Sequence, residues 1–212
     1  MPGVADLLYW QLRWLFVMTP PGGLISVRGW IRHFLIRMRI YYMGYTHYFT
    51  QKQSVDPLMW QNFREHMDKL YHHYLANPIS AEQICGGYLD KIIVLCDGLG
   101  ENRLNDGSLF TDDGEALCFN GNAADDMNHE TFIVQREIPV EDYWDCCKTA
   151  YKPYDVFVVA ALLLLHNLCP GYFSVSSDGD TLDWQPVLDY VSKAFPYLIL
   201  TLPAGIDVPE AG

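Results

Sequence analysis

The chain has 212 residues, half of them hydrophobic and only 19% charged, which is typical of a globular protein with one good core or two small ones and not of a disordered one. The net charge of −12 is unevenly divided, because residues 1–42 contain five arginines and one aspartate, a net +4, which leaves −16 for residues 43–212. So acidic a body argues against nonspecific binding to nucleic-acid phosphates.

Residues 1–42 differ from the rest of the chain. Two apolar pieces, Leu7–Met18 and Leu24–Tyr42, flank a Pro/Gly break, and neither reaches the ~20 clean apolar residues needed to span a bilayer. We consider three interpretations: a membrane-surface anchor, an organelle-targeting leader, or an upstream extension of a domain that begins at Met43. We favour the extension, because the charge changes sign at this methionine. Membrane contact is expected only if the segment acts as an anchor.

From Met43 the pattern is that of a conventional fold. Residues 45–50 alternate between two faces, as a strand does. Asp56 and Pro57 suit the N-cap and the first position of a helix that ends at Asn77-Pro78. This helix has an apolar stripe at spacings of three and four, made of Met59, Phe63, Met67, Leu70 and Tyr74.

The middle of the chain predicts short strands and turns. Asp112-Asp113-Gly114 is a good hairpin signal between two β-prone runs. Pro139 and the acidic residues after it are typical of a helix start, so we expect a helix through Cys147 to Ala150. The strands expected in this region cover residues 92–96, 109–111, 115–119 and 131–138.

Ten consecutive apolar residues, Val156–Leu165, predict a helix that is buried on nearly all sides. A strand at 172–176 and a last helix at 184–195 follow. The order β-α-β-β-β-β-α-α-β-α predicts a single α+β domain over residues 43–196, with a largely antiparallel sheet packed with about four helices. Residues 197–212 are expected to form a C-terminal tail.

The start of the buried helix is the strongest candidate for a site. Pro153 suits the first helical position, and Asp155 falls in the first turn, where the helix dipole favours a carboxylate. Lys148 and Lys152 stand just ahead. Free backbone N–H groups, the positive helix end and two ammonium groups together predict an anion site. The simpler alternative is that Asp155 only caps the helix and the lysines are solvated.

Polar side chains at the other expected strand ends and loops complete this candidate site. We expect them to converge on one pocket at the N-terminus of the buried helix, with Tyr48 or Trp184 as an aromatic wall. His47 and His129 are the candidate general bases or acids, because imidazole titrates nearest neutrality, and Glu130 is the third candidate catalytic residue. The candidate ligand contacts are Thr46, Tyr48, Asn120, Lys148, Lys152, Ser176, Ser177, Asp178 and Trp184. Structural hydrogen bonds are the competing interpretation of each histidine.

Sequence motifs that would indicate a specific reaction or cofactor are incomplete or absent. His129-Glu130-Thr131 matches one half of a two-histidine phosphoesterase, but the other half is missing. Acidic pairs in the loops are better explained as solvated side chains than as a metal site. No nucleotide-binding glycine motif occurs, so no cofactor is expected. Six cysteines without a C-x-x-C pair suit reduced thiols in a cytoplasmic protein and argue against structural zinc.

Several short motifs together resemble one family. They are Met43-Gly44-Tyr45-Thr46-His47-Tyr48, Phe119-Asn120-Gly121, His129-Glu130-Thr131-Phe132, Cys147-Lys148-Thr149-Ala150, Lys152-Pro153-Tyr154-Asp155 and Ser174-Val175-Ser176-Ser177-Asp178-Gly179 with Trp184. The chain is similar in these motifs to short proteins of unknown function from bacterial and phage genomes. The likeness covers nearly all of residues 43–195 and none of the first 42. It implies that Met43 is the natural start, and it implies no activity.

The sequence leaves two functions open. The first is a protein that handles a small anionic ligand, such as a nucleotide or a phosphorylated metabolite, at the N-terminus of the buried helix. The alternative is a non-enzymatic inhibitor or binder that uses its acidic face against a basic protein partner. The arrangement of the polar side chains separates them, because a ligand site needs a concavity.

Overall fold

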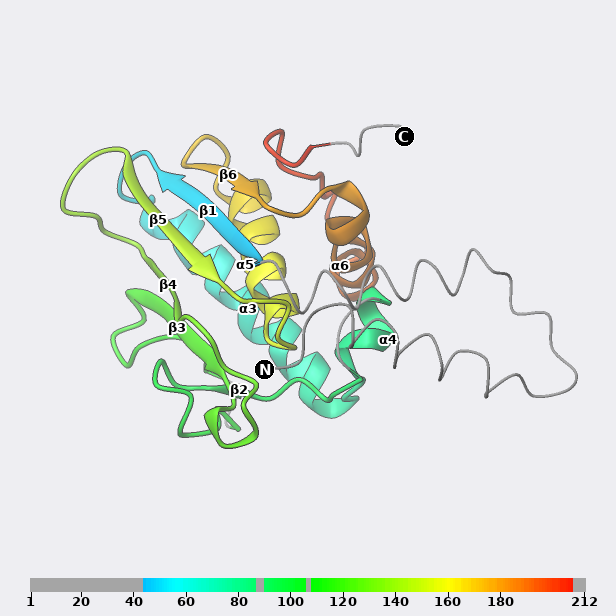
Figure 1. Ribbon diagram of the computed structural model, residues 1–212. Coiled ribbons are helices and arrows are strands. Elements are labelled where there is room, and N and C mark those ends of the chain that lie inside the picture. Colours follow the sequence, from blue (N-terminus) through cyan, green and yellow to red (C-terminus); the bar gives the residue numbers. More distant parts are fainter. Residues whose placement is uncertain (1–43, 87–89, 106–107, 208–212) are drawn as a thin grey trace, which may run out of the picture. The chain divides into compact units, whose positions relative to one another are not determined.

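The computed structural model describes residues 44–86, 90–105 and 108–207 (Figure 1). Its elements in chain order are β1 (Thr46–Gln51), α3 (Pro57–Ala76), α4 (Ala81–Cys85), β2 (Leu95–Cys96), β3 (Ala116–Gly121), the 3-10 turn η1 (Ala123–Asp125), β4 (Phe132–Gln135), β5 (Tyr143–Lys148), α5 (Asp155–Leu168), β6 (Phe173–Ser177) and α6 (Thr181–Ala194). All of these residues fall in one compact unit of the chain. The interpretations of residues 1–42 lie outside the described residues.

The strands form two antiparallel sheets of three strands each, in the orders β5-β1-β6 and β2-β3-β4. Together with the four α-helices of the described residues, they confirm the predicted α+β class. In the first sheet, His47 of β1 lies opposite Cys147 of β5 and Ser177 of β6. Directly opposed residues share a face of a sheet, so these three side chains lie together.

The two faces of the β5-β1-β6 sheet differ. His47, Phe49 and Gln51 are buried on the inner face, which packs against the helices. Their neighbours Tyr48 and Thr50 are only partly buried, on the outer face. The alternation predicted for this strand is therefore confirmed. It places the polar side chains of β1 in two sets, one buried on the inner face and one partly exposed on the outer face.

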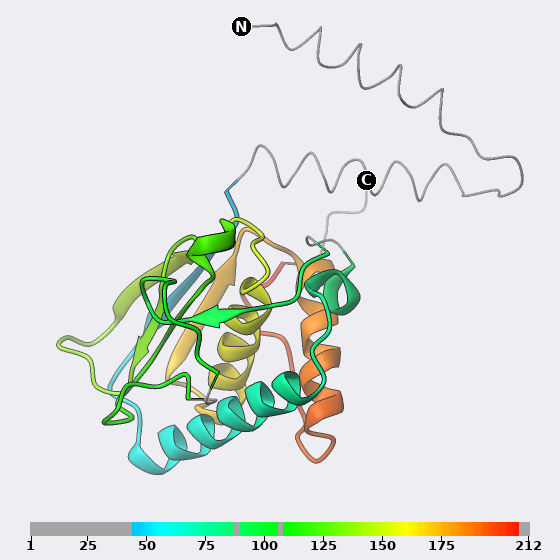
Figure 2. The same cartoon turned by 90° about the horizontal axis from the view of Figure 1, so that it is seen from below.

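Helix α5 is the centre of the unit. Every residue from Asp155 to Leu165 is buried, as the unbroken apolar run predicted. The helix lies between the β5-β1-β6 sheet and the helices α3 and α6 (Figure 2). Its first turn therefore opens onto the inner face of the sheet, where any polar group has to find a partner inside the protein.

The prediction of a helix from Pro139 to Ala150 is wrong. This segment contains strand β5, and the acids Glu141 and Asp142 lie in the turn before it, where Asp142 has a positive φ of 53°. Pairing with β1 along six residues outweighs the local helix-start signal. Helix α5 also begins two residues after Pro153, with Tyr154 at its N-cap.

The short helix α4 was not predicted, although Ser80 and Gln83 form a capping box at its start. Residues 197–207, predicted as the start of a tail, pack onto the unit: Gly205 bridges Ser176, and Ile206 is buried. In the described part of the chain, no helix is both long and apolar enough to cross a membrane.

Candidate functional site

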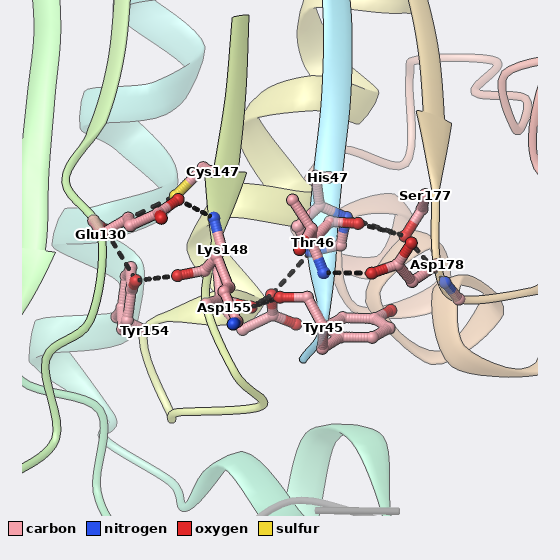
Figure 3. Close-up of polar contacts among 12 residues, drawn as sticks. Tyr45, Thr46, His47, Glu130, Cys147, Lys148, Tyr154, Asp155, Ser177 and Asp178 are labelled. Atoms are coloured by element: carbon pink, nitrogen blue, oxygen red, sulfur yellow. Dashed lines mark hydrogen bonds and ion pairs between the residues drawn. The ribbon is translucent and has the colours of Figure 1, made fainter. Parts of the chain in front are cut away.

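Three side chains from three elements meet beneath the end of the β5-β1-β6 sheet (Figure 3). The imidazole of His47 has no exposed surface. Its Nε2 lies 2.7 Å from Oδ1 of Asp155, and its Nδ1 lies 3.0 Å from Oγ of Ser177. We call these residues the inner trio. They come from β1, from the first turn of α5 and from the end of β6, so only the tertiary fold brings them together.

The hydrogen bonds around the inner trio define where its protons lie. An ionised carboxylate can only accept, so the Nε2–H of His47 donates to Asp155 and the lone pair of Nδ1 faces Ser177. The N–H of Gly179 donates to Ser177 Oγ over 3.0 Å, and the Ser177 hydroxyl has two acceptors, Nδ1 of His47 at 3.0 Å and the Thr46 carbonyl at 3.5 Å. Thr149 Oγ1 donates a second hydrogen bond to Asp155 Oδ1. Each polar atom of the imidazole is therefore paired, and Nδ1 of His47 is the nearer of the two acceptors of the Ser177 hydroxyl.

Aromatic rings enclose the histidine. The ring of Tyr45 lies edge-on, 4.9 Å from the imidazole, and that of Trp184 lies 5.5 Å from it. Burial raises the pKa of Tyr45, and the nearby Asp155 carboxylate raises it further, so this phenol stays protonated. Trp184, predicted as an aromatic wall, is completely buried beside His47.

The loop from β5 to α5 holds Asp155 in place. Ala150 and Tyr151 have φ values of 51° and 56°, a left-handed conformation that costs about 1–3 kcal/mol for a non-glycine residue. The contacts around them maintain it: the N–H groups of Thr149 and Ala150 both donate to the carbonyl of Tyr45, and Tyr151 stacks on Tyr45 at 3.8 Å. This tight loop between β5 and α5, bonded to Tyr45, positions the start of α5 under β1.

The helix N-terminus predicted to bind an anion has two of its first-turn donors occupied. The N–H of Asp155 donates to the Lys152 carbonyl over 3.0 Å, and that of Phe157 donates to the Tyr154 carbonyl over 3.0 Å. Lys152 is engaged as well, because its Nζ lies 3.5 Å from Oδ2 of Asp126. The predicted anion site, made of free helix N–H groups and two unpaired lysines, is therefore not formed. Lys148 does lie near the end of β1, with its side chain against Gly44, and it has no ion pair among the described residues.

Asn120 and His129 lie in a separate corner at the end of β3, which we call the Asn120 corner. The Asn120 amide Nδ2 donates to the carbonyls of Gly98 and His129, while its Oδ1 accepts from the N–H groups of Gly121 and His129. The side chain of His129 is exposed. Neither residue touches the inner trio. The predicted convergence of His129 and Asn120 with His47 is not what the fold brings about.

Glu130 connects the Asn120 corner to β5 and to the start of α5 through one side-chain and one backbone oxygen. Its Oε2 accepts the Lys148 N–H over 2.6 Å, and its carbonyl accepts the Tyr154 hydroxyl over 2.7 Å. Its carboxylate is therefore bound to strand β5 and not directed at His47 (Figure 3).

The remaining candidate residues lie on the other side of β1 from the inner trio. Asp178 accepts the Thr46 N–H over 3.0 Å and the Tyr48 hydroxyl over 3.2 Å. Ser176 is exposed on the outer face. Of the twelve predicted residues, His47, Ser177 and Trp184 come together on the inner face, and Thr46, Tyr48 and Asp178 come together on the other side of the strand.

Asp155 is the functional candidate whose partner the sequence did not reveal. It was interpreted as a helix-start residue, while its carboxylate is the partner of His47 and Thr149. The available signal was an acid directly before a wholly apolar run, because a buried charge requires a partner. Among the residues described, no three His, Cys, Asp or Glu side chains are placed to hold a metal ion.

Comparison of the chain with protein-family models, with curated proteins and with solved structures found no match. The resemblance of residues 43–195 to a family of bacterial and phage proteins therefore stays a prediction. The geometry of the site has to be interpreted from its own chemistry.

Proposed function

We propose that the protein is an enzyme of the acyl-transfer class, in which Ser177 is the nucleophile and His47 is its general base. The observation that carries the proposal is the pair of contacts on opposite sides of one imidazole, 3.0 Å to the Ser177 hydroxyl and 2.7 Å to the Asp155 carboxylate. Hydroxyl, imidazole and carboxylate in this order are the nucleophile, base and orienting group that recur on unrelated folds.

The proposed reaction gives each member of the inner trio one kind of role. Ser177 Oγ attacks the carbonyl carbon of an ester or amide, and its proton passes to Nδ1 of His47. His47 returns this proton to the leaving alcohol or amine, which leaves Ser177 acylated. A water molecule then gives a proton to Nδ1 of His47 while its oxygen attacks the acyl carbon. The bond from the acyl carbon to Ser177 Oγ breaks, His47 returns the proton to Oγ, and the acid leaves. Asp155 stabilises the imidazolium in both steps.

The substrate class follows from access and charge. Ser177 is partly exposed, whereas His47 and Asp155 have no exposed surface, so a substrate reaches the inner trio through the serine. Lys148 lies on β5 and Ser177 on β6, with β1 between them, and its partner Thr46 places Lys148 on the other face of the sheet. We infer a small substrate with an anionic group that reaches past the end of β1 to this ammonium. The predicted anionic ligand is thus kept, but its charge partner is Lys148 and not the helix N-terminus.

The cellular setting is inferred from the thiols. All six cysteines are free, which suits a reducing compartment such as the cytoplasm.

A phosphonofluoridate probe tests the proposal, because it forms a covalent bond only with activated serines. We expect mass spectrometry to locate the label on Ser177 in the wild type and to find none there in Ser177→Ala. In Asp155→Asn, the labelling rate of Ser177 should fall by about 100-fold or more, because the imidazole loses its orienting charge. The matched control is Ser174→Ala, which removes an exposed hydroxyl from the outer face of the same strand and should label at the wild-type rate.

Two results would overturn the proposal. One is an unlabelled Ser177 in folded wild-type protein at a probe concentration that fully modifies a known serine hydrolase. The other is an equal labelling rate in the wild type and in Asp155→Asn, which would mean that the trio is only a structural network.

A further inference from the structure

Strand β5 has an edge that the fold leaves largely unpaired. It pairs with β1 on one side, and the Thr149 N–H bond to the Tyr45 carbonyl shows that its odd-numbered residues direct their backbone groups to that side. On the other side, Lys148 bonds Glu130, and the N–H of Cys146 bonds the side chain of Asp145. The outward N–H and carbonyl of Trp144 have no partner in the described ranges.

A groove of about 180 Å³ lies beside this edge, between β5 and β4. Phe49, Ile133 and Ile138 supply apolar walls, and Gln51 and Asp145 supply polar ones. Strand β4 also turns an edge toward the groove, because its other edge pairs with β3. An extended chain bonded to β5 here would direct alternate side chains into the groove and over the opposite face of the sheet.

The surface next to this edge is acidic and aromatic. The segment Glu141–Asp145 contains three carboxylates and two aromatic rings and no cation. Tyr143 is 39% exposed and Trp144 is 59% exposed, with Trp144 stacked on Tyr48 at 6.3 Å. The one arginine nearby in sequence, Arg136, already pairs with Glu115 and Glu137. Within the described part of the chain, none of the three carboxylates has an ion pair.

These features select one kind of occupant. Exposed indole and phenol faces attract Lys and Arg side chains, and free carboxylates pair with the same cations. The unpaired backbone of Trp144 suits a partner that is extended. We propose that the β5 edge, defined as Glu141–Cys146 with the adjoining groove, binds an extended basic peptide segment of a partner protein. The proposal goes beyond the acyl-transfer function and does not depend on Ser177.

The test uses the full chain and a fluorescein-labelled peptide, Arg-Val-Arg-Val-Arg. Fluorescence polarisation should show saturable binding that weakens as salt is added. Arg-Pro-Arg-Pro-Arg, which has the same charge but lacks the alternate N–H donors, should bind about tenfold more weakly. Hydrogen exchange should slow in residues 143–148 when the first peptide is bound.

Matched variants locate the site. Glu141→Gln/Asp142→Asn should weaken binding about tenfold, and Trp144→Ala by a similar factor. Glu101→Gln/Asp112→Asn removes the same charge from two exposed acids elsewhere and should bind as the wild type does. Ser177→Ala should also bind normally. Equal loss in the two double variants, equal binding of the proline peptide, or protection outside β5 would each overturn the proposal, because any of them reduces the interaction to overall charge.

Discussion

Two regions of this molecule each combine a histidine with a buried polar side chain and differ in what these side chains bond. In the inner trio, Asp155 and Ser177 each bond the central imidazole of His47. In the Asn120 corner, the amide of Asn120 bonds four backbone groups and leaves His129 exposed. A side chain that is saturated by backbone groups holds a loop in place. A titratable side chain held between a hydroxyl and a carboxylate can move a proton.

Removal of the buried carboxylate should have the largest effect. Asp155→Ala leaves Nε2 of His47 without a partner in the interior and leaves the Thr149 hydroxyl only the Tyr45 carbonyl, 3.5 Å away, so we expect the free energy of unfolding to fall by about 3–5 kcal/mol. Asp155→Asn keeps an oxygen that accepts a hydrogen bond and should cost about half as much. Urea unfolding of the three proteins measures both values. Equal losses in Ala and Asn would show that the hydrogen bonds of Asp155 contribute nothing.

Removal of the amide in the other region should cost less and leave the chemistry intact. Asn120→Ala loses bonds to Gly98, Gly121 and His129, and we expect a fall of about 1–3 kcal/mol in the free energy of unfolding. Labelling of Ser177 by the phosphonofluoridate probe should be unchanged in the folded variant. Thermal unfolding and labelling rates check the two statements separately. If Asn120→Ala had normal stability but lost the labelling of Ser177, the conclusion that the Asn120 corner has only a structural role would be wrong.

The sequence predicted those parts of the fold whose signals are local. The cap and stripe of α3 and the apolar run of α5 were sufficient for both helices. Strand β5 was missed because its six residues form a strand only when β1 lies beside them. His47 and Ser177 were predicted as site residues one by one. The carboxylate partner of His47 was not, since Asp155 is 108 residues from His47 along the chain and meets it only through the packing of α5 under the sheet.

The two adjacent cysteines of β5 give the smallest and most local probe of the inner trio. Cys147 lies opposite His47 on the inner face and is 1% exposed, whereas Cys146 faces the other way and is partly exposed. Burial raises the pKa of Cys147, so little reactive thiolate forms there. We expect iodoacetamide at pH 8 to alkylate Cys146 about tenfold faster than Cys147 in the native protein, and both equally in urea. Peptide mass spectrometry measures the two rates, with Cys146→Ser as the control that isolates Cys147. Similar native rates would mean that the inner face opens to solvent, and the closed environment assigned to His47 would then be wrong.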